Sequence, residues 1–197
     1  YITSARAERG DDVGTIEAFE KAIRVEEDEV SIGWCFHDLG MAHYRLAEYA
    51  KAVDCLESSL SRLPGEAIPM SSLAWILANA PNPAHNNLER ALQLAGQSVE
   101  LSPEEAECQL TLGVVSFRNE SYRDACERLN NAMLSLEDPQ QQVKGMWILA
   151  MSNWKIDDRV NATTWLQRAG ELMSTLTRID GESNRFRKEA EEMVQGL

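Results

Sequence analysis

Four segments of this 197-residue chain repeat one spacing of small and apolar residues. In the first, Leu39-Gly40 is followed after twelve residues by Ala52, four later by Leu56 and three later by Ser59. The glycine position recurs after 39, 34 and 37 residues, at Asn79, Gly113 and Ala150. Since steps of three and four residues lie on one helix face, the pattern predicts helices that approach closely at their small residues.

A repeat of this length favours an array of helix hairpins, each of which leaves an apolar face for the next to cover. No segment alternates with period two, so we expect no sheet. The expected helices pair as 2–9 with 13–25, 29–46 with 49–62, 70–80 with 87–101, 103–119 with 122–135, and 139–156 with 159–173, and a last helix covers 183–194.

Proline marks several of the expected helix ends. Ser102-Pro103 and Asp138-Pro139 each place a capping side chain before a proline, which predicts helix starts at 103 and 139. Pro64-Gly65 ends the helix before it. Pro81-Asn82-Pro83 ends another and opens a loop over 81–86, which we interpret as a tolerated insertion at the edge of the array.

The spacing resembles the tetratricopeptide repeat. The best copy comprises Phe36, Leu39-Gly40, Tyr49, Ala52, Leu56, Leu60 and Pro64. The resemblance implies an all-α, right-handed superhelical solenoid of stacked antiparallel helix hairpins with a C-terminal capping helix. It implies one repeat domain over 1–197, with repeats at about 1–28 (partial), 29–68, 69–102, 103–138 and 139–174, and the capping helix at 183–194.

A finer likeness lies in residues 73–83 and 91–95, which look like the variant repeat in the C-terminal arrays of large bacterial signalling proteins such as serine/threonine kinases. The first residue is Tyr1 and no leader pattern follows it. We therefore expect a region of a larger, bacterial protein.

Charge and cysteine usage restrict the classes of partner. The chain has 19 Lys and Arg against 32 Asp and Glu, a net charge of −13, which disfavours nucleic acid and anionic membrane surfaces as partners. No apolar run is long enough to span a bilayer. The four cysteines show no CxxC spacing and lie within expected helices. So few cysteines in a chain of this length favour a reducing compartment, and we expect a cytoplasmic protein.

Motifs of catalysis and metal binding are absent from the sequence. There is no phosphate-binding loop, dinucleotide fingerprint, HExxH or GxSxG. His37 and His43 are six residues apart and do not share a helix face. We expect a non-catalytic protein without metal or cofactor. A further hypothesis is an enzyme whose active site lies between the helices. A deep polar cavity with two carboxylates of strongly shifted pKa would support it.

The candidate binding residues lie near the ends of three first helices. An aromatic residue precedes a cation at steps of 73 and 37 residues, in Tyr44-Arg45, Phe117-Arg118 and Trp154-Lys155. The family resemblance places further residues on the same inner surface: His37, Met41, Val114 and Met151 as peptide contacts, with Trp34, Leu110 and Trp147 beside them. These residue types are enriched in interfaces, and they predict a partner protein or peptide with apolar anchors and some acidic residues. Our first hypothesis is therefore a non-catalytic protein-interaction scaffold that binds a peptide or helix of this partner in a concave groove lined by the first helices.

Three alternatives stay open at this point. The aromatic residues can instead pack inside the array, with the cations lying over them. Residues 183–194, with an apolar stripe of Phe186, Ala190, Met193 and Val194, can either cover the last hairpin or occupy the binding surface. The apolar faces can also bury one another between two copies, which would make the chain a self-associating array and a homodimer.

Overall fold

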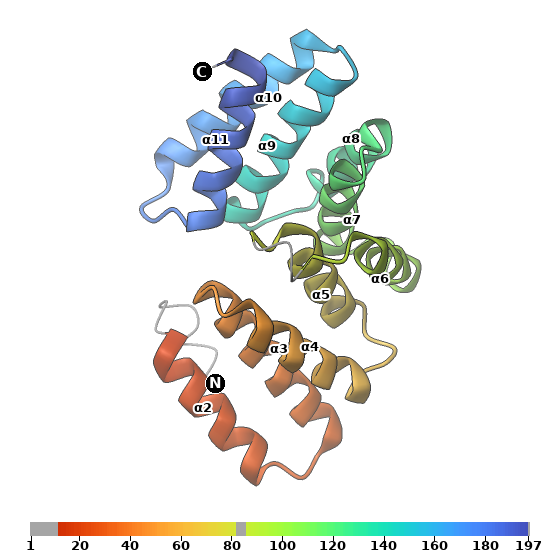
Figure 1. Ribbon diagram of the computed structural model, residues 1–197, viewed down its shortest axis with the longest axis vertical. Helices are drawn as coiled ribbons and strands as arrows, with labels where there is room; N and C mark the ends of the chain where they lie inside the picture. The colour runs from red at the N-terminus through yellow and green to blue at the C-terminus, as the bar shows by residue number, and fades with distance from the viewer. Residues whose placement is uncertain (1–11, 82–85, 197) are drawn as a thin grey trace. The chain divides into compact units, whose positions relative to one another are not determined.

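The computed structural model describes residues 12–81 and 86–196, and all of their regular secondary structure is α-helical (Figure 1). This confirms the prediction of an all-α fold of helix hairpins. The predicted helix at 2–9 lies outside the described residues. The helices are α2 (Asp12–Val25), α3 (Glu29–Arg45), α4 (Tyr49–Arg62), α5 (Ala67–Asn79), α6 (Leu88–Leu101), α7 (Ala106–Arg118), α8 (Tyr122–Ala132), α9 (Pro139–Lys155), α10 (Arg159–Thr175) and α11 (Gly181–Gln195).

The helices form two compact units that divide after Leu101. Unit 1 holds α2 to α6, and unit 2 holds α7 to α11. The antiparallel hairpins pair α3 with α4, α5 with α6, α7 with α8 and α9 with α10. We call the earlier helix of each pair the first helix and the later one the second helix. Within a unit, a first helix also packs on the second helix before it, as α5 does on α4 and α9 on α8. The single repeat domain over 1–197 and its right-handed superhelix stay predictions.

The repeated small and apolar positions that follow the glycine position all lie on α4, α6, α8 and α10 and are buried there. Every one of them is at most 8% exposed, and most are fully buried. They are Ala52, Leu56, Ser59, Ala91, Ala95, Ser98, Ala125, Leu129, Ala132, Ala162, Leu166 and Ala169. The predicted burial is confirmed, and Leu56 and Leu129 lie directly against Gly40 and Gly113 of the partner helices.

Gly113 on α7 marks one of the closest approaches within a hairpin. A Cβ atom built at Gly113 would lie 2.6 Å from Leu129 Cγ and 3.2 Å from the backbone nitrogen of Leu129 on α8. A backbone atom cannot rotate away as the end of a side chain can. Glycine at position 113 is therefore required by the distance between α7 and α8.

We expect Gly113→Ala to lower the free energy of unfolding of unit 2 by about 1–3 kcal/mol, because the added methyl overpacks the hairpin. The matched control is Gly170→Ala, since Gly170 is an exposed residue of α10 whose added Cβ would meet only Trp147 Cη2, at 3.9 Å. There the loss of backbone freedom in the unfolded chain should raise stability by about 0.5–1 kcal/mol. Urea unfolding followed by circular dichroism measures both, and equal stabilities would contradict the packing argument.

Three hairpins close with the same turn. The turn residues Ala47, Glu120 and Asp157 have φ of 60°, 60° and 67°, in the left-handed region. In each case the next residue's amide donates to the carbonyl five positions earlier at 2.9 Å, in the pairs Glu48–His43, Ser121–Ser116 and Asp158–Asn153. This bond satisfies a carbonyl that the end of the first helix would otherwise leave unpaired.

One of the two predicted proline starts is wrong. Asp138 does cap α9, and its side chain accepts from the Gln140 amide at 2.8 Å. Ser102, however, does not cap a helix at Pro103, because α7 begins at Ala106. Residues 102–105 make a turn closed by the Glu105 amide on the Ser102 carbonyl at 3.1 Å. Since α6 ends at Leu101, these four residues are needed to reverse the chain direction.

Candidate protein-interaction surface

The three aromatic residues of the predicted site pack first within their own hairpins. Each ring contacts the residue five positions further on, at the start of the second helix. Ring centroids are 5.7 Å apart in both Tyr44–Tyr49 and Phe117–Tyr122, and the Arg159 guanidinium carbon lies 3.5 Å from the Trp154 ring centroid. Phe117 is buried, whereas Tyr44 and Trp154 are half-buried. Packing inside the hairpin thus explains part of the recurring aromatic pattern.

The three cations differ from one another. Arg45 and Lys155 are exposed, and the Lys155 ammonium lies 5.8 Å from the centroid of the Tyr122 ring. Arg118 is half-buried and is bound to Glu189 of α11. The three positions recur in sequence but do not present equal charges to solvent.

In unit 1, α3 presents a partly exposed row of side chains, Trp34, His37, Met41 and Tyr44. His37 Nε2 lies 3.0 Å from Ser72 Oγ on α5, and its Nδ1 lies 3.0 Å from Asp38 Oδ1. Trp75 of α5 donates its indole N–H to the Tyr44 hydroxyl at 3.1 Å. The predicted residues His37, Met41 and Tyr44 therefore share one face of α3 beside α5.

In unit 2 the predicted contacts are less accessible. Val114 and Met151 are completely buried, and Leu110 and Trp147 are 1% exposed. These four side chains form packing contacts in the folded chain. A role for Val114 or Met151 in partner binding stays a prediction and would require that whatever covers them move.

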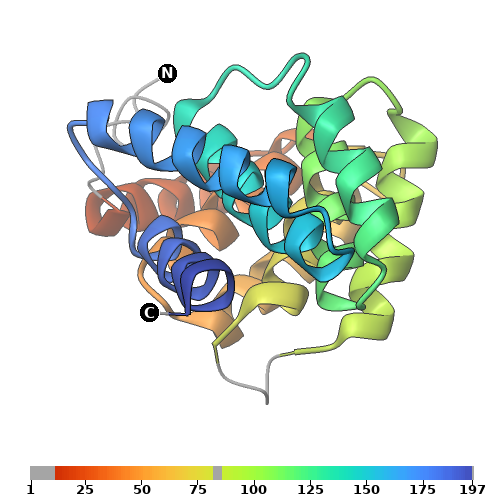
Figure 2. The same cartoon turned by 90° about the horizontal axis from the view of Figure 1, so that it is seen from above.

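The helix that follows α10 packs mainly on α9. Elsewhere a first helix contacts the preceding second helix more than the preceding first helix, as α9 does with α8 and α7. For α11 this order is reversed, because it lies more on α9 than on α10. Figure 2 shows α11, the darkest blue helix, beside the last hairpin. The predicted C-terminal helix is present and covers the last hairpin. It packs there on α9, the first helix of that hairpin.

An apolar stripe on α11 makes this contact. Phe186 and Ala190 are fully buried and Val194 is 7% exposed, while Met193 is half-buried. Positions 186, 190 and 194 are four residues apart and share one helix face. The predicted stripe of residues 183–194 is confirmed as the packing face of α11.

Arg118 connects α7 to α11. Its guanidinium nitrogens donate to both carboxylate oxygens of Glu189, and the Nη2–Oε2 distance is 3.0 Å. The guanidinium carbon is also 5.4 Å from the Phe117 ring centroid and 5.4 Å from that of Phe186. Arg118 thus binds one carboxylate while it lies against an aromatic ring from each helix, which is a favourable setting for guanidinium.

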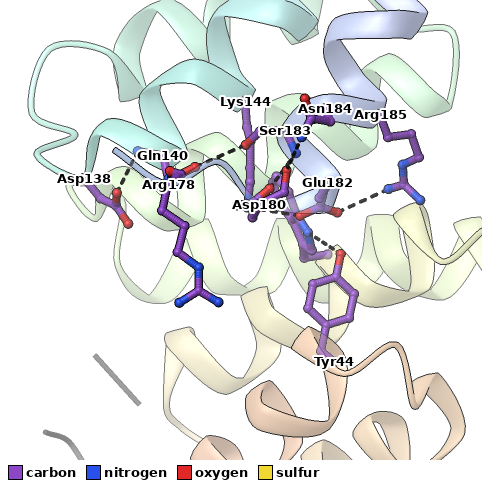
Figure 3. A network of polar contacts seen from close by, with 11 residues as sticks. Tyr44, Asp138, Gln140, Lys144, Arg178, Asp180, Glu182, Ser183, Asn184 and Arg185 are labelled. Atoms are coloured by element: carbon purple, nitrogen blue, oxygen red, sulfur yellow. Dashed lines mark hydrogen bonds and ion pairs between the residues drawn. The ribbon is translucent and has the colours of Figure 1, made fainter. Parts of the chain in front are cut away.

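Lys144 of α9 holds the first turn of α11 (Figure 3). Its ammonium lies 3.0 Å from Asp180 Oδ2 and 3.2 Å from Glu182 Oε2. Burial would lower the pKa of Lys144, but the charges of Glu182 and Asp180 outweigh it, and the pKa lies above the ordinary 10.5. Lys144 therefore stays charged at neutral pH and neutralises two carboxylates in a largely buried position.

Asp180 also ends the connection to α11. Its Oδ1 accepts from the Ser183 amide at 2.6 Å, which caps the helix. Burial favours a higher pKa for this carboxyl, but Lys144 and the Ser183 amide hold it below the ordinary 3.8. Gln140 of α9 donates through its side chain to the Arg178 carbonyl just before Asp180 (Figure 3).

Sequence reasoning did not find the residues that hold α11. Lys144, Asp180, Glu182 and Glu189 are not in the predicted site, and their partners lie 36 to 71 residues away in the chain. Lys144, a lysine in the interior of a first helix rather than near its end, was the available signal. Among the described residues, no group of histidine, cysteine and carboxylate side chains could hold a metal ion. No described helix is long and apolar enough to cross a membrane.

The architecture of the chain matches that of known repeat structures. A tetratricopeptide-repeat protein of Thermus thermophilus superposes with a TM-score of 0.70 at 16% identity, over 98% of this chain and 96% of its own. The fold is tetratricopeptide-like. MamA of Desulfovibrio magneticus RS-1 superposes with a TM-score of 0.63 at 19% identity, over 90% of this chain and 94% of its own. The Cut9–Hcn1 complex of the APC/C gives 0.74 at 17% identity, over 95% of this chain and 34% of the matched one.

Part of this chain is similar in sequence to curated proteins. The BBSome complex member BBS4 of Bos taurus is 27% identical over 118 residues, 60% of this chain and 21% of that protein. The peroxisomal targeting signal receptor of Candida glabrata is 29% identical over 100 residues, 51% of this chain and 16% of that protein. The chain spans about a fifth or less of the length of these relatives. No protein-family model matches it.

Proposed function

We propose that this chain is a non-catalytic protein–protein interaction scaffold that binds a peptide or helix of a partner protein on its first helices. We propose further that it is one region of a larger protein. The observation that carries the proposal is that α7 and α9 already hold a helix. They do so through Arg118, which lies against two aromatic rings, and through the buried Lys144.

The relatives support the same class of function. One is described as a targeting signal receptor and another as a member of a complex, and both descriptions imply that the protein binds other molecules. Since this chain covers a small share of each, their partners are not transferred to it. The tetratricopeptide-like fold supports a scaffold because each hairpin adds one more first helix to a binding face.

The charges favour a partner with apolar anchors and acidic residues. The chain as a whole carries a net charge of −13, yet the cations Arg118 and Lys144 are placed where a helix docks. Trp34, Met41 and Tyr44 offer partly exposed apolar surface on unit 1. The four cysteines are free thiols, which fits a reducing compartment, and we propose the cytoplasm.

Combining Trp154→Ala with Arg118→Glu tests the function. Affinity capture with the full chain from cells of its source should fall at least about tenfold in this double variant, because one anchor and one cation are lost. Trp165→Ala with Arg168→Glu is the matched control, since it changes another aromatic–arginine pair, 5.1 Å apart, on the second helix α10. The control should capture as well as the wild type and keep its helicity by circular dichroism, and the double variant should lose no more helical signal than that of α11.

The outcomes separate the hypotheses. Equal capture by the wild type and by the Trp154 and Arg118 variant would show that these residues are not the site. A wild-type chain that enriches no protein over an equally acidic unrelated protein would remove the scaffold function. Sedimentation at several concentrations addresses self-association, and a stable dimer in which Trp154 and Arg118 are protected would favour the self-associating array.

A further inference from the structure

The chain's own α11 shows what chemistry the side of unit 2 formed by α7 and α9 accepts. We call this side the α7–α9 face and define it by the residues Phe117, Arg118 and Lys144. We propose that α11 is a tethered occupant of this face and competes there with a partner. That partner is a helix carrying an aromatic residue and, three residues further on, a carboxylate. The inference rests on the scaffold function proposed above and names the partner chemistry of that site.

The position of α11 supports a binding role for the face. A helix that simply extended the stack would lie mainly on α10, as α5 lies on α4 and α9 on α8. Instead α11 lies mainly on α9, which is a first helix. The chain therefore turns back over the type of helix on which the partner site was predicted.

The contact is specific rather than merely apolar. Phe186 and Glu189 are three residues apart, so they project from one face of α11. Both meet Arg118, the ring through a 5.4 Å centroid distance and the carboxylate through two hydrogen bonds. A guanidinium that binds a carboxylate in this paired way selects for geometry as well as charge.

The short connection makes α11 a strong competitor. Only residues 176–180 separate α10 from α11. A segment tethered this closely acts at an effective concentration of roughly millimolar, so a free partner must exceed that advantage. Weakening the Phe186 and Glu189 contacts should therefore expose Arg118 to a partner that carries the same two groups.

The test uses the full 197-residue chain and two fluorescent peptides. One peptide is residues 178–196, and the other is an alanine-based helix that carries only phenylalanine and glutamate three residues apart. The chain is made as wild type, as Glu189→Lys, and as the matched control Glu192→Lys. Glu192 lies on the exposed side of α11 and pairs with Lys188 of the same helix, at 3.7 Å. We expect Glu189→Lys to bind both peptides at least about tenfold more tightly than wild type or the control, since the tethered competitor is weakened.

A charge exchange distinguishes recognition from simple loosening of the fold. The Arg118→Glu chain should not bind peptide 178–196, but it should bind that peptide when Glu189 of the peptide is replaced by lysine. Hydrogen exchange checks the state of each chain: in Glu189→Lys the amides of α11 should exchange faster, while those of α7 to α10 stay protected. If Glu189→Lys disturbs α7 to α10, Phe186→Ala replaces it.

Failure of this inference can be told apart from failure of the scaffold function. If the weakened chains bind neither peptide while the wild type still captures a partner, α11 is a structural cover and the scaffold function stands. If the Arg118→Glu chain binds peptide 178–196 with the same affinity whether position 189 is glutamate or lysine, Arg118 does not select the carboxylate and the inference is wrong. If the wild type captures no partner, the proposed function is lost whatever the peptides do.

Discussion

Replacing Lys144 with methionine should weaken the docking of α11 by about 3–5 kcal/mol, because removing one partner of a buried ion pair leaves uncompensated charge. The side chains of Lys144 and Glu182 are each 11% exposed, so water cannot readily replace the lost ammonium. Both carboxylates would then lose the ammonium at the start of α11, although Glu182 still pairs with Arg185 of the same helix at 3.2 Å. Methionine keeps most of the apolar stem, which limits the change to the charge.

Hydrogen exchange of the α11 amides measures this effect directly, and fast exchange confined to residues 181–195 is the expected result. Lys51→Met is the matched control, because Lys51 pairs with Glu48 at 3.0 Å but its side chain is 62% exposed. An exposed pair of this kind contributes little, so the control should leave exchange unchanged throughout the chain. Unaltered protection of α11 in Lys144→Met would show that the apolar stripe alone holds the helix.

Trp147→Ala should lower the free energy of unfolding of unit 2 by about 3–5 kcal/mol. Trp147 is 1% exposed on α9, and its indole nitrogen has no hydrogen-bond partner among the described residues. Nearly the whole loss is therefore apolar contact together with the cavity left behind. Urea unfolding followed by circular dichroism measures it.

Trp154→Ala, seven residues further along the same helix, is the natural comparison. Trp154 is half-buried and meets the Arg159 guanidinium at 3.5 Å, a contact worth about 1 kcal/mol. The two tryptophan variants should thus differ in stability by about 2 kcal/mol or more. Similar losses for both would mean that Trp154 is as much a core residue as Trp147.

These two tryptophans show how far the sequence could predict the site. The repeated spacing of small residues predicts the hairpins and their buried contacts, because only small side chains let two helices approach closely. It also assigns Trp147 and Trp154 to one helix and one repeat. Exposure depends on which neighbours cover each turn of that helix, and periodicity within one segment carries no such information. Phe117, Val114 and Met151 are buried for the same reason.

The C-terminal helix illustrates a second limit. Its apolar stripe is visible in the sequence and predicts a helix with one buried face. The stripe does not specify which helix receives that face, since α9 and α10 both offer apolar surface. The choice is made by ion pairs such as Arg118 with Glu189, between residues 71 positions apart. Long-range charge pairing of this kind is not encoded in any local pattern.

The three left-handed turns at Ala47, Glu120 and Asp157 have a consequence for protein engineering. Each turn, together with the aromatic residue before it and the residue on which that ring packs, forms a six-residue corner: 44–49, 117–122 and 154–159. Because the three corners have the same pattern of backbone hydrogen bonds, one corner can replace another. A designer who lengthens or shortens the array can cut and splice at them and keep the helices on either side intact.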